Sequence, residues 1–361
     1  MEPRDMITKS RDGEPLAKSE IVRLLEYPSD SPETYAVMAE ANCISKELTR
    51  NRAEIHGQLA LNLGPCPCDC MFCSFAQTNG VFREEIRLDA DSVVASAQQL
   101  EREGVNAVYV MVTARYPLEL FIEMSSEIRR NLKPSTVMVA NVGDQSLSDA
   151  VKIKDAGYAG VYHALRLREG EDTGLLPDKR RTSIWNFLEA GLQVGTCVEP
   201  VGPEHTNEEL AEMILFATSF SPAFSGAARR ISIPGTRMAE RGMISELRMA
   251  QIVAVTRLSM PRTVGGNCTH EPCTLGGLGG ANLFWAEVGA NPRDTEAKTE
   301  EGRGDTVADC RQMFYECGWK VLEGPSRYFG SVESVNTRVP VRGCLLYTSD
   351  AADEEDSVDL G

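Results

Sequence analysis

The stretch at residues 58–73 reads QLALNLGPCPCDCMFC. Its first six residues form an apolar run with the length of a buried strand, and the run leads directly into four closely spaced cysteines. Three of them, Cys66, Cys70 and Cys73, have the spacing C-x₃-C-x₂-C. Thiolates gathered on one loop are the donors that hold iron–sulfur clusters, and three donors leave one iron of a 4Fe–4S cube open to an outside ligand. The stretch therefore predicts a strand followed by a metal-binding loop.

Zinc is the alternative occupant of such a loop. Zinc normally takes four ligands in two separated pairs, and no paired C-x₂-C follows at zinc-finger distance. We therefore interpret the loop as an iron–sulfur site. Cys68 does not belong to the spacing, so it is either a spare thiol or a residue that faces a second site.

Apolar runs that read as strands alternate with amphipathic helical segments after this loop. Gly104, Gly157 and Gly191 follow three of the helical segments and are typical stop signals. About eight strands separated by helices indicate a parallel sheet. We expect an α/β fold, a closed (β/α)₈ TIM-type barrel with an N-terminal helical extension, and a doubly wound open sheet is the alternative. After the strand at 58–63, the expected strands are 107–113, 136–141, 160–163, 192–199, 230–233, 262–264 and 281–287. The expected helices are 92–102, 118–131, 146–156, 182–190, 208–216, 244–258 and 306–317.

The expected organisation is a helical lead-in at 1–55, the barrel at 56–330 and a tail at 331–343. Residues 344–361 read CLLYTSDAADEEDSVDLG, which resembles the translation of a sequencing-library adapter fused to a truncated gene. A natural acidic tail is the alternative. This segment carries six acids and no base, so the net charge of −16 becomes −10 without it.

Composition excludes several classes of protein. The 361 residues are 42% hydrophobic and 25% charged, which is ordinary for a globular protein. The negative net charge argues against a nucleic-acid surface. No run of eighteen apolar residues and no secretory signal is evident, so we expect no membrane span and a cytoplasmic location. In that setting, eleven cysteines favour metal or redox chemistry over disulfides.

The cysteine loop directly after a first barrel strand resembles the signature of the radical S-adenosylmethionine (SAM) superfamily. The resemblance implies that the amino and carboxylate groups of SAM chelate the open iron. An electron from the cluster then splits the sulfonium, and the released 5′-deoxyadenosyl radical abstracts hydrogen from a substrate. Phe72, the aromatic residue just before the last cysteine, matches the pattern and is expected near the adenine.

Within that superfamily the chain resembles the biotin synthase group, from the helical lead-in to about Gly318. The two-component lipoyl synthases and hydrogenase-cofactor enzymes are similar relatives. The most specific stretch, GGANLFWAE at 279–287, is similar to the last barrel strand of the group. Other similar stretches are RYP at 115–117, YHALR at 162–166, EPVGP at 199–203 and NPRD at 291–294.

The resemblance also implies residues that bind SAM. Arg180 matches the position at which relatives place an arginine for the SAM carboxylate, and Arg181 is a near rival because the helix phase is uncertain by one residue. Glu199 is expected to bind the ribose hydroxyls or the ammonium group. Alternatively, the arginines are ordinary surface residues and Glu199 is a structural loop acid.

Three further residues are candidates for substrate binding. Arg166 ends a strand, where its guanidinium can hold a substrate carboxylate bidentately. His163 lies in the same segment, and Arg115 follows the second strand where the group has a loop that faces substrate and SAM. A barrel-rim ion pair for the arginines, and a packed structural role for His163, are the alternatives.

The chain departs from biotin synthase at the auxiliary cluster. That family uses three further cysteines with an arginine to hold a second cluster that supplies sulfur, but the second and third strands here contain no cysteine. We expect Cys197, Cys268 and Cys273 to rebuild an auxiliary iron–sulfur site. The alternative is that all three are buried apolar residues, which are common inside barrels.

Three hypotheses about function follow. The first is a radical SAM enzyme that inserts sulfur, as biotin synthase-like enzymes do. The second keeps hydrogen abstraction without sulfur transfer, as in rearrangement or hydrogenase-cofactor enzymes, and the third is a non-catalytic iron–sulfur carrier or scaffold. The expected partners are a small-molecule substrate and an electron donor such as flavodoxin or ferredoxin, and the resemblance allows a homo- or heterodimer.

Overall fold

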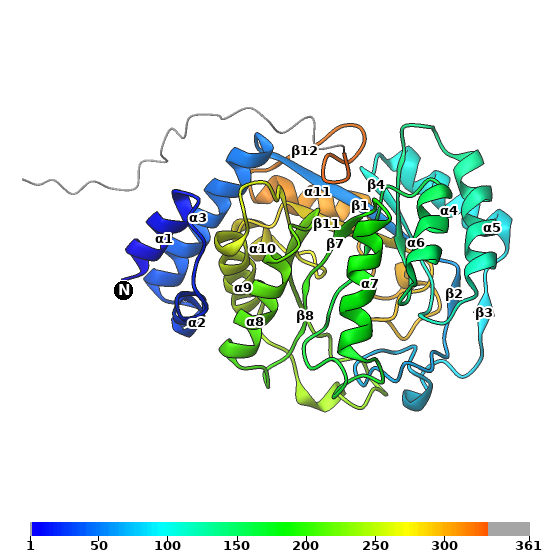
Figure 1. Ribbon diagram of the computed structural model, residues 1–361, viewed down its shortest axis with the longest axis horizontal. Coiled ribbons are helices and arrows are strands. Elements are labelled where there is room, and N and C mark those ends of the chain that lie inside the picture. The colour runs from blue at the N-terminus through cyan, green and yellow to red at the C-terminus, as the bar shows by residue number, and fades with distance from the viewer. Residues whose placement is uncertain (1, 331–361) are drawn as a thin grey trace, which may run out of the picture.

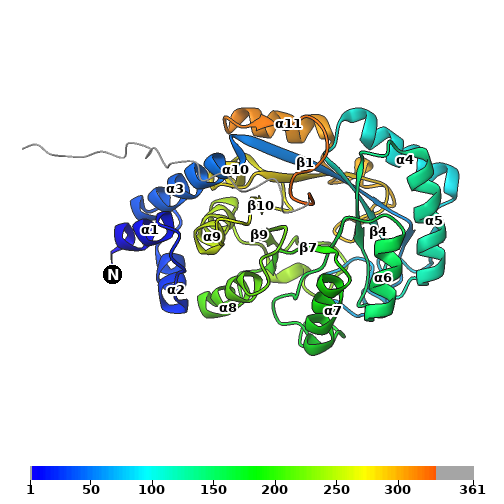
Figure 2. The same cartoon turned by 45° about the horizontal axis from the view of Figure 1, so that its top comes forward.

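Eight parallel strands close into a barrel that is ringed by helices (Figures 1 and 2). The computed structural model describes residues 2–330. Closure is complete because β10 pairs with β9 on one side and with β11 on the other. The expected (β/α)₈ fold is confirmed. The barrel strands are β1 (Arg52–Ala60), β4 (Ala107–Met111), β5 (Val137–Asn141), β6 (Gly160–Tyr162), β7 (Gln193–Gly195), β9 (Phe224–Arg229), β10 (Gly266–Cys268) and β11 (Leu283–Val288).

Four short strands lie at the ends of the barrel. β2 (Asn62–Leu63) and β3 (Ile86–Arg87) form an antiparallel pair beside the cysteine loop. β8 (Val198–Val201) follows β7 and also pairs with β9, so the strand expected at 192–199 is interrupted. β12 (Lys320–Val321) pairs with the start of β1.

The helices alternate with the strands around the outside of the barrel (Figure 2). Asp89 caps the first of them by accepting from the Ser92 N–H, and Gly104 ends it with a φ of 83°. Positive φ angles at Gly157 and Gly191 agree with the stop signals expected there. These helices are α4 (Ala90–Glu103), α5 (Leu118–Asn131), α6 (Leu147–Asp155), α7 (Pro177–Glu189), α8 (Asn207–Thr218), α9 (Glu246–Ser259), α10 (Thr274–Leu278) and α11 (Val307–Glu316). Three 3₁₀ turns, η1 (Gln77–Asn79), η2 (Ala239–Arg241) and η3 (Thr299–Glu301), lie in loops.

An N-terminal extension of α1 (Pro3–Arg11), α2 (Lys18–Glu26) and α3 (Pro32–Thr49) covers one flank of the barrel (Figure 1). Ser45 of α3 donates to the carbonyl of Gly280 at 2.7 Å. Gly280 has a φ of 96°, and an added Cβ there would lie 2.8 Å from the Ala41 backbone, so glycine permits this close approach. No described helix has the length and apolar character of a membrane span.

Several expected boundaries were wrong. The strand expected at 230–233 is β9 at Phe224–Arg229, and the one expected at 262–264 is β10 at Gly266–Cys268. Both are rich in small residues, because a Cβ on Gly266 would lie 2.4 Å from the Phe224 side chain. β1 starts at Arg52, so the helical lead-in is shorter than 1–55. The tail at 331–343 and the segment at 344–361 lie outside the described residues.

Aromatic side chains fill the barrel interior toward the end where the strands begin. Tyr109, Phe224 and Trp285 contact one another or His56 edge to face. Phe329, near the end of the described chain, packs into the same cluster. Within residues 2–330, this cluster therefore fills the barrel toward the end where its strands begin, and the cavity lies where they end.

Candidate functional site

The cysteine loop lies at the C-terminal ends of the barrel strands, where (β/α)₈ enzymes place their chemistry. Its two ends are joined, because the Cys66 N–H donates to the Phe75 carbonyl at 2.6 Å and the Gln77 N–H donates to the Cys66 carbonyl at 2.9 Å. The loop is also attached to its neighbour, since Ser74 donates to the Pro292 carbonyl through both its N–H and its hydroxyl. The three candidate ligands are thus held on one compact segment.

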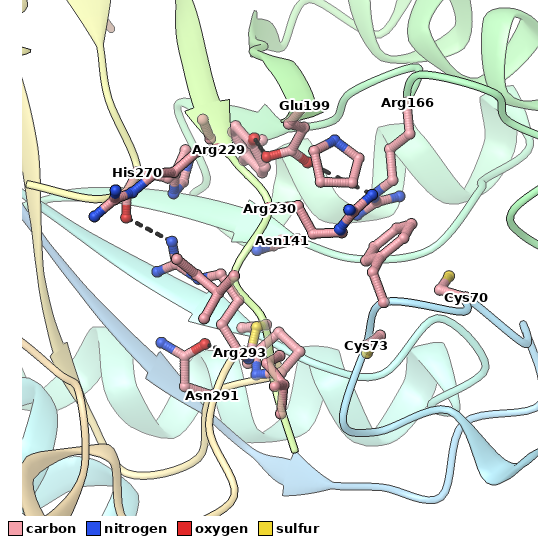
Figure 3. A pocket seen from close by; sticks show the side chains of 18 of the residues that line it. Cys70, Cys73, Asn141, Arg166, Glu199, Arg229, Arg230, His270, Asn291 and Arg293 are labelled. Atoms are coloured by element: carbon pink, nitrogen blue, oxygen red, sulfur yellow. Dashed lines mark hydrogen bonds and ion pairs between the residues drawn. The ribbon is translucent and has the colours of Figure 1, made fainter. Parts of the chain in front are cut away.

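The thiols of this loop differ in their surroundings. Cys70 and Cys73 line a cavity (Figure 3). Shielding from water raises the pKa of Cys70 to about 11 and that of Cys73 further. A hydrogen bond from the Cys68 thiol lowers the pKa of Cys66 to about 6. Cys68 is therefore buried against Cys66, and it does not line the cavity.

The cavity between the cysteine loop and the strand ends has a volume of about 130 Å³. Figure 3 shows Cys70 and Cys73 on one side of the space, with His270 and Arg293 toward the other. The further lining residues include Gln58, Phe72, Met111, Asn141, Tyr162, Arg166, Glu199, Pro200, Arg229, Arg230, Ile231, Ile233, Asn291 and Pro292.

Arg166 and Glu199 form an ion pair on the cavity wall. The Arg166 Nε lies 3.6 Å from Glu199 Oε1, and Tyr162 donates to Glu199 Oε2 at 2.7 Å. Burial alone would lower the pKa of Arg166, but Glu199 and Glu169 hold that pKa above its usual value. The Arg166 guanidinium donates no hydrogen bond to any residue in 2–330. A permanent cation with unused donors therefore borders the cavity next to the cysteine loop.

Arg180 and His163 lie behind this wall instead of in it. The Arg180 Nε is 3.3 Å from Asp144 and 3.8 Å from Glu169, and its Nη1 contacts the His163 ring at 2.8 Å. His163 also contacts Asp144 at 3.0 Å. Burial and the charge of Arg180 lower the pKa of His163 to about 3, so the ring is neutral. The structure places both side chains in a buried network and neither lines the cavity, so their expected SAM and substrate contacts stay predictions.

Two other candidate arginines face solvent. Arg181 pairs with Asp178 on the outer side of α7 at 2.9 Å, so the helix phase turns Arg180 inward instead. Arg115 is exposed and does not line the cavity. Phe72, in contrast, is part of the cavity wall, as expected of the aromatic residue next to the last cysteine.

Several cavity residues were missed by sequence reasoning. Arg293 pairs with Glu271 at 3.0 Å and with Glu287. His270 stacks on Trp285 with 3.9 Å between ring centroids, and its buried Nε2 has no partner among the described residues. Their position along the chain could have identified them, because Gln58 and Asn141 lie on barrel strands and His270 follows β10 by two residues. Side chains at the C-terminal ends of barrel strands gather around the site.

Comparisons with known proteins agree with this geometry. No family model matches the chain. Biotin synthase of Rhodococcus jostii (strain RHA1) is 25% identical over 276 residues, which cover 74% of this chain and 80% of that protein. Biotin synthase of Mycobacterium leprae is 25% identical over 292 residues, covering 77% and 83%. The chain is a radical SAM enzyme of the biotin synthase-like group. Its cofactors are accordingly a 4Fe–4S cluster and SAM.

Solved structures share the fold of this radical SAM enzyme. Methylornithine synthase (PylB) superposes with a TM-score of 0.73 at 16% identity, over 90% of this chain and 98% of that one. The FeFe-hydrogenase maturase HydG from Carboxydothermus hydrogenoformans gives a TM-score of 0.72 at 17% identity, over 88% and 78%. Both likenesses concern the barrel architecture.

The residues of the loop fit the cofactors of a radical SAM enzyme. Three thiols on one segment supply the donor set of a cube with an open corner. The unused donors of Arg166 suit a carboxylate, and the unpartnered Nε2 of His270 is a buried polar atom that a bound molecule would satisfy. Cys66, Cys70 and Cys73 would hold the cluster.

The three cysteines expected at an auxiliary site are not gathered together. Cys197 and Cys268 lie in the aromatic cluster of the barrel interior, with their sulfurs 3.7 Å apart. Cys273 packs in the outer core between strands and helices, where its sulfur accepts from the Gly276 N–H at 3.3 Å. The structure thus joins two of the three, and neither of the two lines the cavity.

Asp172, Glu204 and His205 form another group with the residue types of a metal site, and their ligand atoms lie within 4.8 Å of one another. However, the Gly202 N–H donates to His205 Nδ1 at 2.9 Å, so the proton of the neutral ring is on Nε2, which cannot then bind a metal. Glu204 is already paired with Arg230 through both oxygens. We assign this group to an ion-pair network between loops.

Proposed function

We propose that this radical SAM enzyme abstracts hydrogen from a small carboxylate-bearing molecule held in the cavity. Cys66, Cys70 and Cys73 are the proposed cluster ligands. The observation that carries the proposal is that Cys70, Cys73 and Arg166, whose guanidinium makes an ion pair with Glu199 but donates no hydrogen bond within residues 2–330, border one cavity. When bound, the cluster supplies the electron that cleaves SAM and so yields the hydrogen-abstracting deoxyadenosyl radical.

Residues of the cavity wall orient the bound molecules. Arg166 binds a carboxylate of SAM or substrate, because a guanidinium offers a planar fork of donors. Glu199, fixed by Tyr162, accepts from ribose hydroxyls or the SAM ammonium group. Phe72 supplies an apolar surface beside the adenine.

The rest of the wall selects the substrate and excludes water. Met111, Ile231, Ile233 and Pro292 are apolar, and they keep the reacting carbon away from bulk solvent. Burial, with the charges of Arg293 and Arg166, holds the pKa of His270 well below 6.5, so a neutral ring meets the substrate. A neutral imidazole pairs with an uncharged polar group, such as a hydroxyl or an amide.

Sulfur insertion is the second candidate function. The approach of Cys197 to Cys268 favours it, because two thiols at 3.7 Å inside the barrel offer ligands for an auxiliary cluster that delivers sulfide to the substrate radical. Against it, aromatic rings surround the pair, and Cys273 lies in a different cluster. In either case we propose flavodoxin or ferredoxin as the electron donor.

Anaerobic reconstitution tests both candidates. About four irons per chain would support hydrogen abstraction alone, and about eight would support an auxiliary cluster and sulfur insertion. With SAM and dithionite, the reconstituted enzyme should release 5′-deoxyadenosine. A variant with serine at Cys66, Cys70 and Cys73 should bind no cluster and release none. Full activity in that variant would contradict the proposal.

A further inference from the structure

The side-chain amide of Asn79 lies inside the cysteine loop. Asn79 ends the η1 turn, and its Nδ2 donates to the carbonyl oxygen of Cys73 at 2.8 Å. The same nitrogen lies 3.3 Å from the Met71 carbonyl and 3.4 Å from the Cys70 carbonyl. Two of these carbonyls also accept a backbone N–H, that of Cys70 from Cys73 at 3.1 Å and that of Cys73 from Ala76 at 3.1 Å, so the amide adds a second donor to each. In residues 2–330, Asn79 is the only side chain that donates to the carbonyls of two candidate cluster ligands.

The opposite end of this amide faces Arg237. Asn79 Oδ1 accepts from the Arg237 backbone N–H at 3.2 Å and from its Nε at 3.3 Å. These donors on one side and the carbonyls on the other fix the orientation of the amide, because a flipped amide would turn its NH₂ toward the Arg237 donors. Asn79 therefore joins the cysteine loop to a second segment of the chain.

Arg237 also contacts the cysteine loop directly. Its Nη2 donates to the carbonyl oxygen of Asp69 at 3.0 Å and to the Asp69 carboxylate at 2.7 Å. Arg237 belongs to the segment 230–242 between β9 and α9, from which Ile231 and Ile233 line the cavity. The cysteine loop and one wall of the cavity are thus connected through two polar side chains.

We propose that Asn79 is a positioning residue that orders the cysteine loop before the cluster binds, and that Arg237 extends this order to the cavity wall. The inference rests on the proposed function, because it takes Cys66, Cys70 and Cys73 as the cluster ligands. A loop whose carbonyls are already satisfied loses less conformational entropy on binding the cluster. The ordered loop therefore retains the cluster longer.

The Asn79→Asp variant tests the donor directly. The substitution preserves size and keeps an acceptor for Arg237, but it turns a second carboxylate oxygen toward the carbonyls of Cys70, Met71 and Cys73. Iron loss to a chelator is followed under nitrogen by the decay of cluster absorbance. We expect loss about 10- to 100-fold faster than in the wild type, the usual range for groups that support metal ligands. Asn131→Asp, the same change at the exposed end of α5, is the matched control and should keep the wild-type rate.

The Arg237→Met variant tests the connection to the cavity wall. It removes the contacts with Asp69 and the Nε contact with Asn79 but leaves the amide in the loop. Because the Arg237–Asp69 pair is partly exposed, we expect a smaller acceleration of iron loss, about two- to fivefold. A rate equal to that of the wild type would overturn the role of Arg237.

Thermal unfolding of the cluster-free chains separates positioning from folding. Asn79→Asp should unfold within a few degrees of Asn131→Asp. If it does not, Asn79→Ser, which keeps a donor and adds no charge, replaces it and should show an intermediate rate of iron loss. Equal rates in the Asn79 variants and the control, with the wild type holding its cluster, overturn the inference alone. A wild-type chain that takes up no iron contradicts the proposed function instead.

Discussion

Two groups of cysteines in this barrel have different surroundings. Cys70 and Cys73 border a cavity, and the carbonyls of their loop accept from backbone N–H groups and from the Asn79 amide. Cys197 and Cys268 lie deeper, 3.7 Å apart, among the rings of Tyr109, Phe224, Trp285 and their neighbours. The first group has room and polar support for a cofactor, whereas the second has close packing.

The comparison teaches that thiol proximity alone does not make a cluster site. An iron–sulfur site needs ligands, open volume and hydrogen bonds to the surrounding backbone. The cysteine loop provides all three. The interior pair provides ligands only, so its sulfurs contribute chiefly to apolar packing.

The largest effect should come from Cys70→Ser. The variant removes a ligand outright, so the loss of iron and of 5′-deoxyadenosine formation should exceed the about 10- to 100-fold cost of removing a supporting group. Iron analysis and chromatography of the SAM cleavage products measure both. Cys43→Ser, in the lead-in helix α3, is the control and should leave both unchanged. Retained cluster absorbance in Cys70→Ser would break the comparison.

Arg166→Met should have the next largest effect. Hydrogen bonds to charged groups contribute about 1.5–3 kcal/mol, so kcat/KM for SAM cleavage should fall about 10- to 100-fold. Arg166→Lys should recover part of this loss, because it restores the charge without the planar fork. Arg181→Met, which removes the surface pair with Asp178 and a cation–π contact with Phe216 away from the cavity, should behave as the wild type. Equal rates for the two methionine variants would exclude Arg166 from the site.

Lowering the pH should reduce the free energy of unfolding through His163, which lies behind the cavity wall. Its folded pKa of about 3 lies below the ordinary 6.5, so the unfolded chain binds a proton first and stability falls as the pH drops below 6.5. Between pH 7.5 and pH 5 this residue should account for about 2 kcal/mol of lost unfolding free energy. Urea unfolding of cluster-free wild type and His163→Gln measures the difference. Parallel profiles of unfolding free energy against pH in the two proteins would contradict this role of His163.

The smallest effect on cofactor content should come from replacing both Cys197 and Cys268 with alanine. About four irons should remain, and SAM cleavage should continue, because neither sulfur lines the cavity. The expected cost is in stability, about 1–3 kcal/mol for small buried truncations. A fall from about eight irons to about four would reverse the comparison and favour sulfur insertion.

Most of the fold could be predicted from the sequence. β-branched and aromatic runs such as β4 identify themselves as buried strands, and glycine stop signals mark several helix ends. β9 and β10 could not be placed, because Ser225, Gly226 and Gly266 have low strand propensity. A Cβ would clash with the Cys268 backbone at Gly226 and with the Phe224 side chain at Gly266, a tertiary effect that local patterns do not contain.

The candidate site was predictable where chain position alone decides it. The cysteine spacing lies within one loop, Arg166 lies in the loop after β6 and Glu199 lies in the short β8, so the barrel topology brings them to the cavity. His163 also follows β6 directly and Arg180 lies in the first turn of α7, yet both contact acidic residues in a buried network, His163 with Asp144 and Arg180 with Asp144 and Glu169. Ion pairs and hydrogen bonds between separate segments decide the positions of these two side chains, and no sequence spacing predicts such contacts.

Phe329 and the rings around it fill the barrel toward the end where its strands begin. Within the part of the chain that the structure describes, we therefore expect molecules to enter and leave at the strand ends beside the cysteine loop. A cofactor seated at these strand ends blocks the exit of whatever lies beneath it, so steady-state turnover should follow a compulsory order: substrate first, SAM second, and products released in reverse.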